Sequence, residues 1–98
     1  MPKAYWVTTY RSIKNPDGVA AYAKLAGPAI KEAGGRFILR GMPAHTFEHG
    51  LNERTVVIEF DSLEKALAAH DTPGYREALK ALGNNSCERD MRVVEGVE

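Results

Sequence analysis

The sequence predicts an α+β fold in which one four-stranded antiparallel sheet carries its helices on one face. Three observations lead to this prediction. Strand-like and helix-like segments alternate in the order β-α-β and then β-α-α-β along the 98 residues. Asn15-Pro16 and Thr72-Pro73 each place a capping side chain before a proline, which is typical of a helix start. Short, right-handed connections then reduce this order of elements to one common arrangement.

The first half of the chain predicts a strand, a helix and a second strand. Residues 4–10 are rich in aromatic and β-branched residues, which favour a strand. Asn15 is a good N-cap for a helix over residues 16–33, where apolar side chains recur at steps of three and four. Gly34-Gly35 supplies the C-terminal stop, and residues 36–41 predict the returning strand.

The second half repeats this plan. Residues 55–60 are almost wholly apolar and predict a strand buried on both faces. Asp61 or Ser62 caps the helix that follows, and Asp61 has capping-box spacing to Glu64. The inner stripe of this helix is expected to be Leu63, Ala66, Leu67 and His70. A further helical piece over 74–82 and a last strand over 91–97 complete a ferredoxin-like βαββαβ order.

Composition limits the classes of function. Thirteen basic and thirteen acidic residues cancel, and no basic run is present, so we expect neither a nucleic-acid partner nor a membrane partner. No apolar stretch approaches a membrane span, and the N-terminal residues lack the basic region and apolar run of a secretory signal. We expect residues 1–98 to form one domain. Cys87 is the only cysteine, so no internal disulfide can form. A cytoplasmic location fits these features.

The sheet is expected to be apolar on both faces. In the first strand Trp6 and Tyr5 fall on opposite faces, and in the third strand Ile58 and Val57 do the same. Two helices cover one face only, and a fully exposed apolar sheet face is too large a patch for a monomer. We therefore predict a homodimer that packs sheet face on sheet face.

Five motifs occur in order and resemble one protein family. They are Gly34-Gly35-Arg36-Phe-Ile-Leu-Arg40-Gly41, Arg54-Thr-Val-Val-Ile-Glu-Phe60, Ser62 with Ala66, Thr72-Pro73-Gly74-Tyr75 and Val94-Glu95-Gly96. The series is similar to domain-of-unknown-function family 1330, within the dimeric α+β barrel superfamily, over nearly the whole chain. The resemblance implies a ferredoxin-like protomer and a homodimer whose sheets form a barrel, and it supplies no reaction. Family members often carry an aromatic pair where this chain has Ala69-His70, which implies a more open and more polar pocket.

Two side chains are candidate catalytic groups. His70 lies on the predicted inner stripe, as either a hydrogen-bonded core histidine or a general base near neutral pH. Glu59 interrupts the most apolar strand, where a carboxylate must be paired, hydrogen-bonded or neutral. Arg40 or Arg54 is its expected partner, and a carboxylate of raised pKa that faces a cavity is the alternative.

The ligand-binding candidates surround the same predicted cleft. They are Arg40, Tyr22, Tyr75, Glu48 and Arg54. An arginine can hold a carbonyl or carboxylate oxygen. Tyrosine hydroxyls can donate to a ligand oxygen, or the rings can serve as core packing with the hydroxyl on a partner.

Residues 45–49 match the His-x-x-Glu-His pattern of one class of zinc protease. That chemistry requires a helix and a third ligand. Gly41, Pro43 and Gly50 crowd the segment, so we expect it either to extend the second strand or to form a hairpin arm. We therefore predict no metal site.

Three kinds of function stay open. The first is an enzyme or binding protein that holds a small carbonyl or carboxylate compound in a cleft between sheet and helices and acts on it by acid–base chemistry. The second is a non-catalytic ligand-binding dimer, and the third is a structural interaction domain. The sequence contains no phosphate loop and no cofactor fingerprint, so we expect no cofactor.

Overall fold

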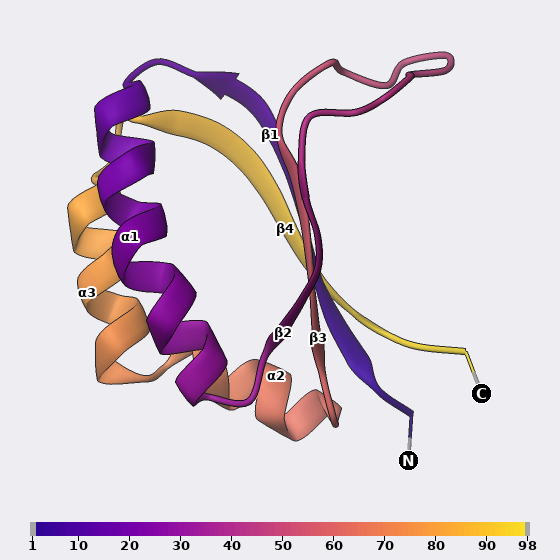
Figure 1. Cartoon of the computed structure of the whole chain (residues 1–98), viewed down its shortest axis with the longest axis vertical. Coiled ribbons are helices and arrows are strands. Elements are labelled where there is room, and N and C mark those ends of the chain that lie inside the picture. Colours follow the sequence, from indigo (N-terminus) through magenta and orange to yellow (C-terminus); the bar gives the residue numbers. More distant parts are fainter. Residues whose placement is uncertain (1, 98) are drawn as a thin grey trace.

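The computed structural model describes residues 2–97 and confirms the predicted ferredoxin-like fold (Figure 1). One antiparallel sheet has the strand order β2-β3-β1-β4. The elements, in chain order, are β1 (Ala4–Ile13), α1 (Pro16–Glu32), β2 (Arg36–Gly41), β3 (Thr55–Phe60), α2 (Leu63–His70), α3 (Pro73–Leu82) and β4 (Cys87–Glu95). The helices α1 and α3 lie together on one face of the sheet, and α2 lies near one end of it (Figure 1).

Two strands differ from their predicted bounds. The first strand runs on to Ile13, and the last begins at Cys87 and ends at Glu95, where residues 91–97 were expected. The reason is their mutual pairing, since Ser12 lies opposite Glu88 and Ile13 opposite Cys87 beyond a bulge. Charged residues do not favour strands by their own propensities, but hydrogen bonds to a neighbouring strand hold them in this conformation. Cys87, which was expected in a loop, is therefore a half-buried strand residue.

Both ends of α1 follow the predicted chemistry. The Asn15 side chain accepts a hydrogen bond from the backbone N–H of Gly18 at 3.3 Å. At the other end the Gly34 N–H donates to the Lys31 carbonyl, and the Gly35 N–H donates to the Ile30 carbonyl. This pair of bonds is a Schellman motif, and Gly34 adopts the positive φ of 95° that the motif requires.

The α2 helix corrects two expectations. Ser62 caps it by accepting from the Lys65 N–H, so Asp61 is not the cap and instead pairs with Arg36. The buried residues are Ala66 and Ala69, whereas Leu67 and His70 are exposed. Small side chains face inward because α2 approaches the sheet closely, and the Trp6 indole N–H donates to the Ala66 carbonyl at 2.9 Å.

The chain between β2 and β3 does not extend the strand, and it takes the alternative form of a hairpin arm, without strand pairing of its own. Residues 42–53, which we call the arm, project beyond the end of the sheet (Figure 1). A turn in which the Gly50 N–H donates to the Phe47 carbonyl forms its tip. Phe47 is 77% exposed there.

The core fills the space between the helices and one face of the sheet. Trp6 is its centre, with ring centroids 5.1 Å from both Phe60 and Tyr75. These three are the largest fully buried side chains among the described residues. On the other face, which we call the outer face, Val7 lies opposite Val57 and only partly buried.

Within residues 2–97, no helix is both long enough and apolar enough to cross a membrane.

The close approach at Gly35 gives a stability prediction. A Cβ built on Gly35 would lie 2.5 Å from a methyl carbon of Ile30 and 3.0 Å from Ile58 and Phe60. We expect Gly35→Ala to lower the free energy of unfolding by about 1–3 kcal/mol, measured by urea denaturation, because the packed core must shift.

The matched control is Gly41→Ala. A Cβ on Gly41 would meet no atom of the described residues within 4 Å. Its effect should stay within about 0.5 kcal/mol. Equal effects of the two variants would contradict the close-packing account.

Candidate functional site

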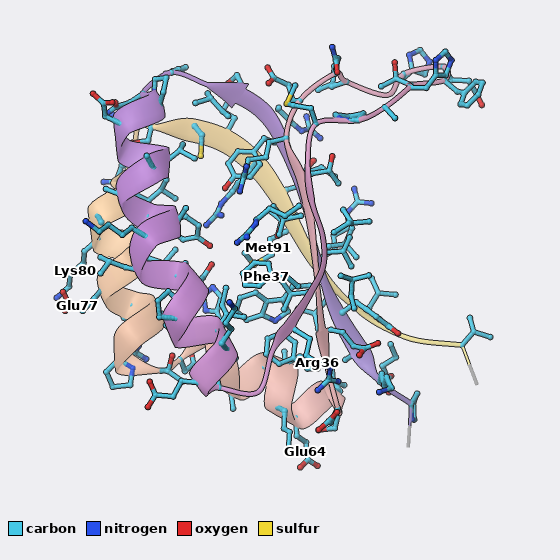
Figure 2. All side chains as sticks on the ribbon, viewed as in Figure 1. Arg36, Phe37, Glu64, Glu77, Lys80 and Met91 are labelled. Atoms are coloured by element: carbon cyan, nitrogen blue, oxygen red, sulfur yellow. The ribbon has the colours of Figure 1, made fainter. Side chains whose placement is uncertain are left out.

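A pocket lies between the inner face of the sheet and α1. It contains about 430 Å³ of empty space, its open mouth included, and it is narrow between its walls. Phe37 and Met91 point from the sheet toward α1 across this space (Figure 2). The wall on α1 carries small residues, Ala23, Ala26 and Gly27, so the helix leaves room where a larger side chain would fill it.

Strand periodicity decides which sheet residues line the pocket. Successive side chains point to opposite faces, so Trp6, Thr8 and Tyr10 of β1 all turn toward the helices. In β2 a bulge interrupts the pairing between Phe37 and Leu39. Beyond it Arg40 pairs with Val56 and lines the pocket, whereas Leu39 pairs with Val57 on the outer face.

Three arginines, Arg40, Arg54 and Arg89, line this one pocket. The guanidinium of Arg40 lies 4.5 Å from the Phe37 ring centroid, and that of Arg89 lies 4.6 Å from the Tyr22 ring centroid. Arg89 also donates to the Tyr10 hydroxyl at 3.3 Å. Within residues 2–97 none of the three makes an ion pair, and the lining contains neither a carboxylate nor a histidine. The pocket is therefore strongly positive.

Two tyrosines meet at the helix side of the pocket. The hydroxyl oxygens of Tyr22 and Tyr75 are 2.7 Å apart. Tyr22 lines the pocket, and Tyr75 lies fully buried behind it. Burial raises the pKa of Tyr75 and also that of Tyr10. Both phenols therefore keep their protons at neutral pH and can donate hydrogen bonds.

The sequence-based candidates divide into two groups. Arg40, Arg54 and Tyr22 line the pocket, and Tyr75 supports Tyr22 from behind. Glu48 does not join them, since it lies exposed in the arm with a positive φ of 53°.

Arg89 is the charged pocket residue that sequence reasoning missed. It was hidden because the last strand was expected to begin only at residue 91. Had the strand been taken from Cys87, its alternation would have put Arg89 on the same face as Met91.

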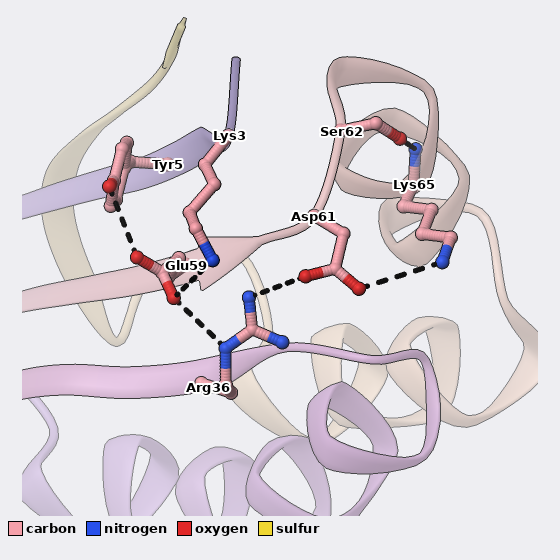
Figure 3. Close-up of polar contacts among 7 residues, drawn as sticks. All are labelled: Lys3, Tyr5, Arg36, Glu59, Asp61, Ser62 and Lys65. Atoms are coloured by element: carbon pink, nitrogen blue, oxygen red, sulfur yellow. Dashed lines mark hydrogen bonds and ion pairs between the residues drawn. The ribbon is translucent and has the colours of Figure 1, made fainter. Parts of the chain in front are cut away.

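Glu59 has partners other than the expected ones. Its carboxylate accepts from Arg36 Nε at 2.9 Å and from the Tyr5 hydroxyl at 3.1 Å, and Lys3 lies 3.6 Å away (Figure 3). Arg40 and Arg54 cannot reach it, because they line the pocket while Glu59 faces outward beside Tyr5. The hydrogen bond from Arg36 lowers the pKa of Glu59, so the alternative of a raised pKa is wrong.

Asp61 extends the same outward-facing network. Its carboxylate accepts from Arg36 at 2.8 Å and lies 3.7 Å from Lys65 (Figure 3). The hydrogen bond from Arg36 lowers the pKa of Asp61 as well. The network thus balances two carboxylates with three cations on the outer side of the sheet.

His70 lies outside the pocket. It ends α2 with a side chain that is 48% exposed, and its Nδ1 is 3.9 Å from Asp71. Its ring packs beside Trp6 and Tyr75, with centroids 6.0 and 5.2 Å away. The structure therefore brings neither Glu59 nor His70 to the pocket. Glu59 lies on the outer face of the sheet, and His70 lies at the end of α2.

The two histidines of the arm do not form a metal-binding constellation. His45 packs against Phe47 with ring centroids 4.7 Å apart. Among the residues that the structure describes, no three side chains of the metal-binding types gather at one point.

Comparisons with known proteins bear on the fold. A family model described as "Domain of unknown function (DUF1330)" matches residues 3–97. No curated protein is similar enough to this chain to count as a match.

Three solved structures illustrate the similarity. A protein of unknown function from Rhodopseudomonas palustris has a TM-score of 0.72 at 17% identity, over 99% of this chain and 84% of that one. SnoaB, a cofactor-independent oxygenase from Streptomyces nogalater, has a TM-score of 0.64 at 13% identity, over 100% and 96%. A dimeric ferredoxin-like protein of unknown function from Thermobifida fusca has a TM-score of 0.57 at 17% identity, over 96% and 91%. At these identities the likeness establishes the fold alone.

The outward network predicts a pH-dependent contribution to stability. The folded-state pKa of Glu59 is lowered, so its contribution is present above the ordinary glutamate pKa and is lost as the pH falls through the lowered value. We expect Glu59→Gln to be less stable than the parent at pH 7 and nearly equal to it at roughly pH 3, by urea denaturation.

Glu77→Gln is the matched control, since it removes a carboxylate whose ion pair with Lys80 is exposed. That variant should differ little from the parent at either pH. A Glu59→Gln penalty that persists unchanged in acid would show that charge pairing is not its cause.

Proposed function

We propose that this chain, which belongs to the DUF1330 family, forms a homodimer and binds a small organic molecule. The molecule is held in the sheet–helix pocket through a carbonyl or carboxylate oxygen. One observation carries the proposal. Arg40, Arg54 and Arg89 line a single aromatic pocket, and no carboxylate among its lining residues balances them. Such charge needs an anionic or strongly polar partner.

The composition of the walls supports an organic ligand over an inorganic ion. The aromatic residues Trp6, Tyr10, Tyr22 and Phe37 line the same space as the three arginines. Ligand sites commonly combine apolar walls with a few polar groups that fix orientation. A flat molecule with an oxygen substituent fits a narrow slot of this kind.

Chemistry in the pocket would rest on electrostatic stabilisation. Fixed guanidiniums stabilise negative charge that develops on a substrate oxygen, as in an oxyanion hole. SnoaB, which shares the fold, is described as a cofactor-independent oxygenase, and it supports a catalytic role for this pocket by analogy alone. Binding without turnover is the second candidate, favoured by the lack of a carboxylate or histidine base among the described residues that line the pocket.

The outer face of the sheet supports the homodimer. Leu39, Val57 and Val7 lie in register across three strands, and Val94 pairs with Tyr5 beside them. Leu39 and Val94 are 47% and 49% exposed. An apolar row of this kind is self-complementary across a two-fold axis, which is the usual geometry of a homodimer. The partner we propose is a second copy of this chain.

Ligand binding can be tested with benzoate as the probe and benzamide as its uncharged counterpart. We expect the protein to bind benzoate more tightly than benzamide. Arg89→Gln or Arg40→Gln should each weaken benzoate binding about tenfold in calorimetry, because a hydrogen bond to a charged group is lost.

Arg76→Gln is the control for charge alone. Arg76 lies on α3, 66% exposed, beside Asp71. Its variant should bind benzoate as the parent does. Equal weakening by all three substitutions would mean that net charge and not the pocket controls binding.

Assembly can be tested by sedimentation with two glutamate substitutions at equally exposed leucines. Leu39→Glu should convert the dimer to a monomer, because it places two charges in the apolar interface. Leu25→Glu changes a residue of α1 that is 45% exposed, and it should leave the dimer intact. A monomeric parent protein, or a dimeric Leu39→Glu variant, would reject the sheet-face dimer.

A further inference from the structure

The hydroxyl pair of Tyr22 and Tyr75 has an unequal environment. Tyr75 is 0% exposed, and its oxygen lies 2.7 Å from that of Tyr22. Its ring packs between Trp6 and His70, with centroids 5.1 and 5.2 Å away. Tyr22 is nearly as buried in the fold, but it lines the pocket. Only one of the two phenols therefore borders the pocket.

This inequality fixes the direction of the hydrogen bond between them. Within residues 2–97, the acceptor available to the Tyr75 proton is the Tyr22 oxygen, because Arg89, the other polar group nearby, can only donate. If Tyr22 donated instead, the Tyr75 proton would be buried without a partner, which is costly. Tyr75 therefore donates to Tyr22, and the Tyr22 proton is directed elsewhere. The pocket is the open space beside it.

Neighbouring groups strengthen that second proton as a donor. The Tyr22 oxygen accepts from Tyr75, and the Arg89 guanidinium lies 4.6 Å from the Tyr22 ring centroid. The hydrogen bond that the Tyr22 oxygen accepts and the nearby positive charge of Arg89 both polarise the O–H group of Tyr22. Arg40 and Arg54 face the same space from the sheet. The pocket thus offers the Tyr22 donor together with three cations, beside the Tyr10 and Thr8 hydroxyls.

The lining of the pocket also limits where negative charge can come from. With neither a carboxylate nor a histidine among the described lining residues, no side chain there is suited to remove a proton from a bound molecule at neutral pH. A hydroxyl ligand that binds there as an anion must therefore be acidic enough to lose its proton to solvent.

We propose that the pocket is an oxyanion site for planar conjugated enols and phenols, which it binds as enolates or phenolates, with Tyr22 as the direct donor and Tyr75 as the residue that fixes the direction of the Tyr22 proton. This rests on the proposed function and names its ligand class. One bond changes on binding: the ligand O–H breaks, its electron pair stays on oxygen, and the proton passes to buffer. Tyr22 and the arginines keep their protons.

The probe for the test is 4-nitrophenol, whose phenolate absorbs visible light that the phenol does not. Its absorbance is titrated against pH with and without saturating protein. We expect the pKa of the bound probe to be lower than that of the free probe by about one unit, which corresponds to a tenfold preference for the phenolate.

Three Phe substitutions separate the roles of the hydroxyls, and each keeps the ring. Tyr22→Phe should abolish most of the pKa difference, because the donor is gone. Tyr75→Phe should lower the preference for the phenolate by only about twofold to threefold, since the Tyr22 hydroxyl remains but is less polarised. Tyr5→Phe should leave it unchanged, because the Tyr5 hydroxyl bonds to Glu59 on the outer face. Thermal melting of each variant shows whether it is folded.

The outcomes distinguish this proposal from the broader one. Binding of benzoate together with equal affinity for 4-nitrophenol and its phenolate would leave the proposed function standing and overturn the oxyanion site. Equal effects of Tyr22→Phe and Tyr75→Phe would reduce the pair to a structural contact and overturn the direction assigned to it. If the protein bound neither benzoate nor 4-nitrophenol, both proposals would be overturned.

Discussion

Every part of this structure depends on the alternation of side chains along β1. Its even-numbered residues Trp6, Thr8 and Tyr10 turn toward the helices, and its odd-numbered residues Tyr5, Val7 and Thr9 turn away from them. Because β1 is a central strand that pairs with both β3 and β4, its register imposes the same division on its neighbours. The pocket, the core and the outer face are consequences of that division.

The inner face combines a packed end with an open one. On the side of Trp6 that meets Phe60, Tyr75 and α2, the inner face is closely packed. Next to the small residues of α1, arginines and tyrosines take the place of aliphatic side chains, and the space stays open. Full burial of a guanidinium without a partner is unfavourable, so these residues favour a pocket that stays open to solvent.

Charge is handled differently on the two faces. Outside, Arg36 joins Glu59 and Asp61 in a network that satisfies its own members. Inside, Arg89 lies over the Tyr22 ring and donates to the Tyr10 hydroxyl, and among the described residues that line the pocket no carboxylate neutralises it. A balanced network is expected of a structural feature, whereas an unbalanced positive pocket is expected of a binding site. The placement of charge, more than any motif, supports the proposed ligand site.

Local sequence patterns determined the order of the elements, because capping and apolar periodicity act between residues that are near in the chain. Asn15, Ser62 and Thr72 all cap helices, and Gly34-Gly35 ends α1. Residue type and position in the predicted elements also singled out Arg40, Arg54 and Tyr22, which line the pocket. Tertiary pairing alone decided that the carboxylate of Glu59 faces Arg36 and that β4 begins early enough to turn Arg89 inward. The bulge in β2, which puts Arg40 rather than Leu39 in the pocket, is of the same kind. Strand register and strand length arise from hydrogen bonds between segments far apart in the chain, and a shift of one residue exchanges the two faces.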